Sequence, residues 1–133
     1  MEISINVSSN LKIKEAQERV ESATRRALKN VTIDIANDVV KGSRVKTGHN
    51  RRSIAYKWET EPKTRMGAPL SGEKPFSEEE PELKSLETAV WSSSGYGGYL
   101  ETGTSRTRAF PYFRPALDKN IGKLPEELKK ELE

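Results

Sequence analysis

Apolar residues recur along the first third of the chain with the spacing of one long helix. Between residues 11 and 41 the positions spaced three or four apart are Ala16, Val20, Ala23, Ala27, Val31, Ile35 and Val39. This spacing places them on one narrow face. No Pro or Gly interrupts the segment, and Gly42 follows it as a C-terminal stop. The sequence therefore predicts a helix over 11–41 that packs on the protein's own sheet and overhangs it, leaving the overhang free for a neighbouring subunit.

Strict alternation of apolar and polar residues predicts three strands. Residues 2–7 alternate around Ile3, Ile5 and Val7, and Ser8 to Asn10 follow with turn and N-cap chemistry. Residues 51–60 and 84–93 alternate in the same way. We expect these last two strands to pair antiparallel.

Residues 61–83 have a different character from the segments on either side. They contain four of the seven prolines, two glycines and the acidic run Glu78–Glu80. Proline cannot donate into a sheet ladder, and an irregular connection of this length is unusual in a compact domain. The segment is either a mobile arm that becomes ordered on binding or a plain insertion.

The last third of the sequence predicts a loop followed by two short helices. Residues 95–112 combine Gly, aromatic residues and Arg without a regular period. Pro115 suits the first turn of a helix, Gly122 interrupts that helix, and Pro125 opens a short terminal helix within 124–133. The elements together predict a single α+β domain over 1–133, in which one long N-terminal helix packs on a small antiparallel sheet and a C-terminal helix is added.

Composition limits how much of this domain its own core can stabilise. Residues of the AVILMFWYC group make up 33% of the 133 residues, and charged residues make up 32%. The core should be modest, so that packing against neighbouring subunits would supply the missing burial. There is no Cys, no secretory signal pattern and no apolar run near the ~18 residues that span a membrane. We therefore expect a soluble, intracellular product without disulfides.

Charge is distributed unevenly along the chain although the net charge is +3. Residues 1–57 carry 12 Lys and Arg against 6 Asp and Glu, whereas residues 58–101 carry 4 against 9. The basic first half and the acidic middle could meet between copies of the protein, or both could be solvated faces.

Residues able to carry catalysis are scarce. His49 is the only histidine, which excludes any site needing two imidazoles, and no GxSxG motif is present. The glycine-rich stretch 95–98 lacks the ending of a phosphate loop, and Glu78–Glu80 lack the spacing of a calcium loop. We therefore predict no catalytic, cofactor or metal site and a protein that is not an enzyme. The main alternative is a nucleic-acid-binding module that uses Arg51, Arg52, Arg106, Arg108 and Arg114.

Three blocks in the sequence resemble one known family. They are VKTGHNRRSI at 45–54, YLETGT at 99–104 and AFPYFRPAL at 109–117. In this order they resemble the neck or tail-component family of long-tailed double-stranded-DNA bacteriophages, whose members read TG-x-L-R-x-S-I, then Y-x-x-x-V-E-x-G-T, then P-F-x-R-P-A-L. Two residues depart from that pattern. Asn50 stands where an apolar residue is common, and Tyr112 intervenes between Pro111 and Phe113.

The resemblance implies a structural role in the virion. Such subunits form or join a ring at the head–tail junction or upper tail, as neck (head–tail connector), tail-completion, tail-terminator or other minor tail proteins. Expected partners are further copies of the chain, adjacent head-closure and tail proteins, and, non-specifically, the genome DNA in the channel, with no membrane. The protein would be made in the host cytoplasm during virion assembly. The residues to which the resemblance assigns a structural or interface role are Thr47, Gly48, Arg51, Arg52, Ser53, Glu101, Gly103, Thr104, Arg108, Phe110, Pro111, Phe113, Arg114 and Pro115.

The chemistry of these residues suggests scaffold roles. Thr47 and Gly48 would make a tight turn, with Gly at positive φ. Arg51 and Arg52 would point to opposite faces of a strand, and one of them could pair with Glu101. Phe110, Pro111, Phe113 and Pro115 would form an apolar hook that fixes the last helix on the sheet.

Overall fold

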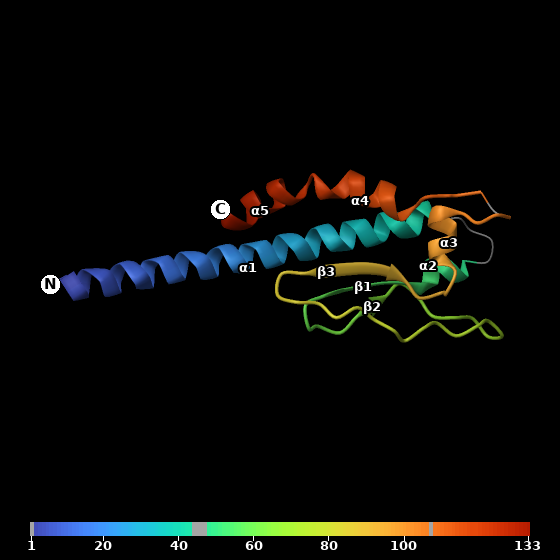
Figure 1. Ribbon diagram of the computed structural model, residues 1–133, viewed down its shortest axis with the longest axis horizontal. Coiled ribbons are helices and arrows are strands. Elements are labelled where there is room, and N and C mark those ends of the chain that lie inside the picture. The colour runs from blue at the N-terminus through green and yellow to red at the C-terminus, as the bar shows by residue number, and fades with distance from the viewer. Residues whose placement is uncertain (1, 44–47, 107) are drawn as a thin grey trace.

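The chain folds into an elongated α+β structure built around one helix. The computed structural model describes residues 2–43, 48–106 and 108–133 (Figure 1). In chain order its elements are α1 (Glu2–Gly42), α2 (His49–Ser53), β1 (Ile54–Trp58), β2 (Thr64–Arg65), β3 (Thr88–Ser92), α3 (Gly97–Thr102), α4 (Phe113–Ile121) and α5 (Leu124–Leu132). The predicted fold class is confirmed: α1 packs on a three-stranded antiparallel sheet, and the C-terminal helices contact α1.

The long helix α1 is longer than predicted. The predicted strand over 2–7 is wrong, because these residues form the first turns of α1. An alternating pattern of six residues forms a strand only beside a partner strand, and the sheet of the described chain lies at the other end of α1 (Figure 1). Ile3 and Val7 are also four residues apart, which suits the helix equally well.

The sheet has the order β2-β1-β3 with both pairings antiparallel. The predicted pairing of the two main strands is confirmed, with Ile54 opposite Ser92 and Tyr56 opposite Val90. Both strands are shorter than expected, because residues 51–53 belong to α2 and residues 84–87 form a turn into β3. The two residues of β2 come from the 61–83 segment and add a third strand.

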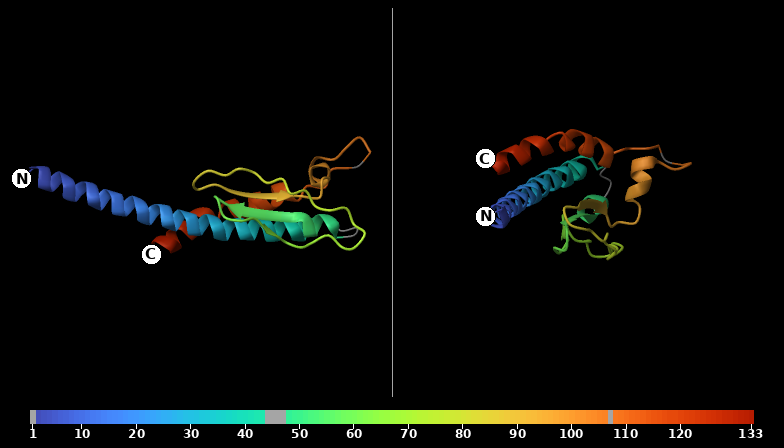
Figure 2. Two further views of the ribbon diagram at one scale, coloured as in Figure 1. Left: turned by 90° about the horizontal axis from the view of Figure 1, so that it is seen from below. Right: turned by 60° about the vertical axis from the view of Figure 1, so that its left-hand side comes forward.

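Helix α1 lies between the sheet and the C-terminal helices (Figures 1 and 2). Its buried stripe consists of Ala23, Ala27, Val31, Ala36 and Val39. Val39 joins Ile54, Tyr112 and Ala116 in the core cluster. As the composition suggests, this core is small and mostly made of Ala and Val on the helix side.

The 61–83 segment runs alongside the sheet and is attached to α2 and to the residue that follows β3. Glu73 accepts a hydrogen bond from Arg52 at 2.6 Å, and Phe76 is 6% exposed with its ring 4.9 Å from that of His49. The amide of Ser77 donates to the carbonyl of Ser93 at 2.8 Å. That the segment acquires its order only on binding a partner stays a prediction.

The basic first half and the acidic middle of the chain meet within one molecule. Ion pairs that join them are Arg25–Glu59, Lys29–Glu61, Arg52–Glu73 and Lys57–Glu80, at 2.6 to 3.2 Å. The hydrogen bond from Arg25 holds the pKa of Glu59 below its usual value, although burial opposes that shift. The sequence analysis considered contacts between copies or solvated faces, and neither describes this pairing. The ion pairs form within one molecule.

Candidate functional site

Asn50 and Tyr112, the two residues that depart from the family pattern, are both buried and contact one another. Asn50 is 2% exposed in α2, and Tyr112, just before α4, is also 2% exposed. The Asn50 Nδ2 donates to the Tyr112 hydroxyl at 3.0 Å and to Ser43 Oγ at 3.0 Å. The first and third sequence blocks are therefore joined by a buried hydrogen bond.

Three serines complete this arrangement. Ser92 Oγ and Ser94 Oγ donate to Asn50 Oδ1 at 2.7 and 2.8 Å, and Ser53 Oγ donates to the Asn50 carbonyl at 2.6 Å. We call Asn50, Ser53, Ser92, Ser94 and Tyr112 the polar cluster. The side-chain amide of Asn50 makes four hydrogen bonds, which is its full capacity. No donor or acceptor of this amide is left for a substrate.

The Tyr112 side chain ties the polar cluster to α3. Its hydroxyl donates to the Gly97 carbonyl at 3.0 Å, and burial raises its pKa, so that the phenol stays a neutral donor. A Cβ at position 97 would lie 2.4 Å from Ser92 Cβ and 2.8 Å from the Tyr112 hydroxyl, and only Gly permits this approach.

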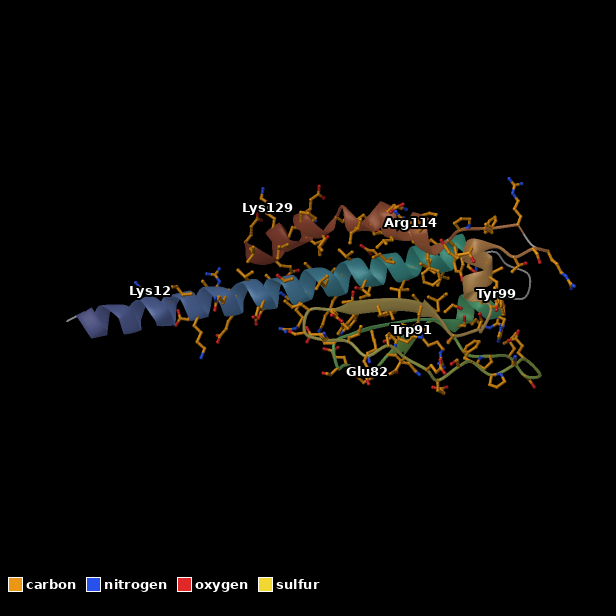
Figure 3. The ribbon with its side chains drawn as sticks, viewed as in Figure 1. Lys12, Glu82, Trp91, Tyr99, Arg114 and Lys129 are labelled. Carbon is orange, nitrogen blue, oxygen red and sulfur yellow. The ribbon has the colours of Figure 1, made fainter. Side chains whose placement is uncertain are left out.

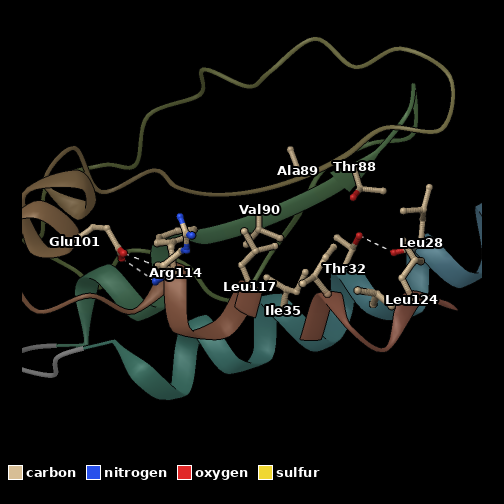
Figure 4. Close-up of a pocket in the computed structure, with 13 residues that line it drawn as sticks. Leu28, Thr32, Ile35, Thr88, Ala89, Val90, Glu101, Arg114, Leu117 and Leu124 are labelled. Atoms are coloured by element: carbon tan, nitrogen blue, oxygen red, sulfur yellow. Dashed lines mark hydrogen bonds between the residues drawn. The ribbon is translucent and has the colours of Figure 1, made fainter. Parts of the chain in front are cut away.

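Glu101, in the second block, caps α4. Its Oε1 accepts from the backbone amides of Tyr112 and Phe113 at 2.8 and 2.7 Å, and its Oε2 accepts from that of Arg114 at 3.2 Å (Figure 4). Helix α4 has no side-chain cap of its own at its first residue. Glu101 thus supplies from α3 the acceptors that the helix start requires, and the carboxylate also suits the positive end of the helix dipole. The suggested ion pair of Glu101 with Arg51 or Arg52 is replaced by this capping role.

Arg51 and Arg52 lie in α2, so the prediction that they point to opposite faces of a strand is wrong. The Arg51 guanidinium donates to the carbonyls of Ser43 and Lys41 at 3.1 Å each, at the end of α1, where a cation is favoured. Arg52 pairs with Glu73 instead. The helix forms here because the positive φ of Gly48 reverses the chain immediately before it.

The remaining motif residues lie around these contacts. Gly48 has the positive φ predicted for it, at 80°; Thr47 lies outside the described residues. Pro115 is in the first turn of α4, as predicted. Gly103 ends α3, and Thr104 Oγ1 accepts from the Arg106 amide at 3.2 Å.

The predicted apolar hook around Pro111 has a different anchor from the one expected. Phe113 packs partly against the core, but Phe110 is 46% exposed. The fully buried aromatic residue between them is Tyr112, whose ring lies 4.8 Å from that of Phe113. The hook therefore holds through a buried tyrosine rather than through both phenylalanines, and the helix that follows packs on α1, so the prediction that it is fixed on the sheet is wrong.

The structure separates the five arginines of the nucleic-acid alternative. Arg51 and Arg52 serve within the fold, and Arg114 pairs with Asp118 at 3.2 Å on the surface of α4. Arg106 and Arg108 are exposed in the loop after α3. Tyr99, 62% exposed, lies at this same end of the molecule (Figure 3).

An open apolar groove of about 480 Å³ lies between α1, β3 and α4 (Figure 4). We call it the α1–β3–α4 groove. Its apolar lining consists of Leu28, Val31, Ile35, Ala89, Val90, Phe113, Leu117, Ile121 and Leu124. Leu117 and Ile121 remain 41% and 49% exposed. Glu101 and Arg114 line one end, and Thr32 and Thr88 complete the wall.

A second uncovered surface lies on α1. The N-terminal part of this helix extends beyond the sheet and beyond α5 (Figure 1). Every side chain from Lys12 to Ser22 is exposed, including Ile13 at 57% and Val20 at 48%. We call residues 12–22 the projecting segment.

Metal ligands do not gather in the described part of the chain, where no group of three or more His, Asp or Glu side chains is placed to bind an ion. Within the same residues, no helix is long and apolar enough to cross a membrane. No family model, curated protein or solved structure matches the chain. The geometry and the sequence blocks therefore carry the functional argument.

Proposed function

We propose that this protein is a structural, non-enzymatic subunit of the head–tail junction or upper tail of a tailed bacteriophage, of the neck, tail-completion or tail-terminator type. The first of the three blocks that resemble this family is far from the other two in sequence, yet the three meet at one junction. Asn50 of the first block binds Tyr112 of the third, and Glu101 of the second caps the helix that Tyr112 precedes. Glu101, Phe113 and Arg114 stand at positions that match the family pattern, so the capping contacts between them support the resemblance. Asn50 and Tyr112 depart from the pattern, and their hydrogen bond adds no support to it.

The observation that carries the proposal is the presence of two different uncovered apolar surfaces on one elongated chain. The projecting segment exposes Ile13 and Val20, and the α1–β3–α4 groove exposes Leu117 and Ile121. Few residues of this chain are apolar, so a protein that worked alone would not be expected to leave both the projecting segment and the groove exposed to solvent. Two unlike surfaces on one subunit favour head-to-tail contacts, which close into a ring when the rotation permits.

The polar groups of the fold support a scaffold rather than a catalyst. The imidazole of His49 is 7% exposed, packs on Phe76, and lies 2.9 Å from the carbonyl of Lys74 through Nε2. The polar cluster is saturated by its own hydrogen bonds. In this proposal the partners are copies of the chain and adjacent head-closure and tail proteins, the protein resides in the virion, and no cofactor takes part.

The test is deletion of the gene from the phage genome that carries it, followed by electron microscopy of the lysate. We expect DNA-filled heads and separate tails to accumulate and plaque formation to fall by several orders of magnitude, because heads and tails cannot join. A plasmid copy of the wild-type gene should restore joined virions. Infectious particles of normal appearance without the gene would refute the proposal.

A second candidate function, nucleic-acid binding, is favoured by the exposure of Arg106 and Arg108 near Tyr99 and Phe110. It predicts that Arg106→Ala/Arg108→Ala weakens binding to duplex DNA and lowers the slope of log K against log salt by about 2. The measurement is a fluorescence-anisotropy titration. Lys129→Ala/Lys130→Ala removes the same charge from exposed positions on α5 and serves as the control. Equal losses in both variants, or no binding by the wild type, would exclude this function.

A further inference from the structure

The projecting segment continues an interface that α1 already makes. Ala23 and Ala27 are fully buried where α5 packs beside α1, held by an ion pair of Arg26 with Glu131 at 2.6 Å. The same three-and-four spacing runs toward the N-terminus through Val20, Ala16 and Ile13, all three of which are exposed. Helical segments of this length are marginal in water without tertiary packing. We therefore expect Ile13, Ala16 and Val20 to pack against a partner, as α5 packs against the next part of α1.

The α1–β3–α4 groove has the opposite property. It is concave and mostly apolar, and its walls keep Leu117 and Ile121 nearly half exposed. Figure 4 shows Leu117 and Val90 directed toward one another across it. One wall is β3, which is an edge strand of the sheet that the described residues form. Apolar side chains from outside would complete the packing of Leu117 and Ile121.

One molecule cannot bring these two surfaces together. Helix α1 runs without a break from Glu2 to Gly42, and the groove lies against its Leu28–Ile35 portion. The projecting segment points away from that portion along the same axis (Figures 1 and 2). The projecting segment can therefore reach an α1–β3–α4 groove only in another copy of the chain.

We propose that the projecting segment of one copy docks in the α1–β3–α4 groove of the next copy, with Ile13, Ala16 and Val20 directed toward Leu117 and Ile121. The contact is head-to-tail, because it leaves a free groove on one subunit and a free projecting segment on the other. This inference rests on the proposed function, for which it supplies the ring contact.

The absence of cysteine from the chain permits a clean cross-linking test. Full-length Val20→Cys and Ile121→Cys proteins are prepared separately, mixed and oxidised. We expect a covalent heterodimer in at least several-fold excess over a control mixture of Leu70→Cys with Ile121→Cys. Leu70 is also exposed, at 57%, but lies outside the proposed contact. Equal yields in the two mixtures would overturn the inference.

A complementation test distinguishes this contact from a symmetric one. Val20→Glu disables the projecting segment and Leu117→Glu disables the groove; both positions are exposed, and circular dichroism checks that the fold is kept. Each variant alone should self-associate about tenfold or more weakly than the wild type, because a charge enters an apolar contact. Mixing them should restore dimers, since one intact groove and one intact segment remain, but no larger species. Sedimentation velocity measures all three samples.

Two results would contradict the head-to-tail contact. A symmetric helix-to-helix contact would be lost with Val20→Glu, unaffected by Leu117→Glu, and not restored by mixing. A wild type that shows neither self-association nor excess cross-linking would also refute it. Both outcomes leave the gene-deletion result unchanged, whereas normal virions without the gene would refute the proposed function and leave the cross-linking result unchanged.

Discussion

Replacing Asn50 by Ala should lower the free energy of unfolding by about 3 kcal/mol. The substitution removes four side-chain hydrogen bonds at a residue that is 2% exposed. Ser94 and Tyr112 are buried and Ser92 is half-buried, and their hydroxyls lose a shared partner, which costs more than the loss of the bonds themselves. Urea denaturation followed by circular dichroism measures the change.

Asn37→Ala is the matched control for this experiment. Asn37 lies on the exposed face of α1, and its replacement should change the free energy of unfolding by less than about 0.5 kcal/mol. A loss at Asn50 no larger than that at Asn37 would show that the polar cluster does not stabilise the fold. Tyr112→Phe keeps the ring and removes only the hydroxyl, so its loss should be smaller, about 1 kcal/mol.

The long helix and the paired strands could be predicted because burial of one face requires apolar residues at a regular spacing, which each of them shows over several residues. The stripe from Ala23 to Val39 is buried as the helical spacing requires, and the pairing of residues 54–58 with 88–92 follows the alternation. The prediction for residues 2–7 failed because an alternation of six residues is too short to exclude a helix, and no strand of the described residues lies beside them. Alternation also extended into 51–53, where the reversal at Gly48 starts a short helix instead.

The roles of the motif residues were harder to predict than the elements. Glu101 was expected to bind a guanidinium, since opposite charges are the obvious partners in a sequence. Its actual partners are backbone amides, which have no signature in a list of side chains. The one available signal was positional: α4 begins after Pro111 with no Ser, Thr, Asp or Asn to cap it, so an acceptor had to come from elsewhere.

In the sequence, Asn50 and Tyr112 stand out only as departures from the family pattern, yet their side chains are hydrogen-bonded to each other. A polar residue at an apolar position and an extra aromatic residue 62 positions later compensate one another. The run Ser92-Ser93-Ser94 was a further signal, since three hydroxyls at the end of a half-buried strand need hydrogen-bond partners. Two departures that look independent in a sequence are thus one structural feature.

Removing the carboxylate of Glu101 should weaken the attachment of α4 more than that of any other element. In Glu101→Ala, the amides of Tyr112, Phe113 and Arg114 lose their acceptors, and we expect the free energy of unfolding to fall by about 2 kcal/mol. Glu101→Gln keeps an acceptor oxygen without the charge and should lose about half as much, since hydrogen bonds to a charged acceptor are roughly twice as strong. Hydrogen–deuterium exchange should show faster exchange at 112–121 with the β1–β3 ladder unchanged.

The same substitution links the stability of α4 to assembly. Helix α4 carries Leu117 and Ile121, the exposed wall of the α1–β3–α4 groove, so loosening it should also reduce cross-linking between Val20→Cys and Ile121→Cys copies. Glu82→Ala, which removes an exposed carboxylate from the 61–83 segment, is the control and should change neither exchange nor cross-linking (Figure 3). Unaltered exchange at 112–121 in Glu101→Ala would mean that water replaces the carboxylate at no cost, and that α4 is held by its packing on α1 alone.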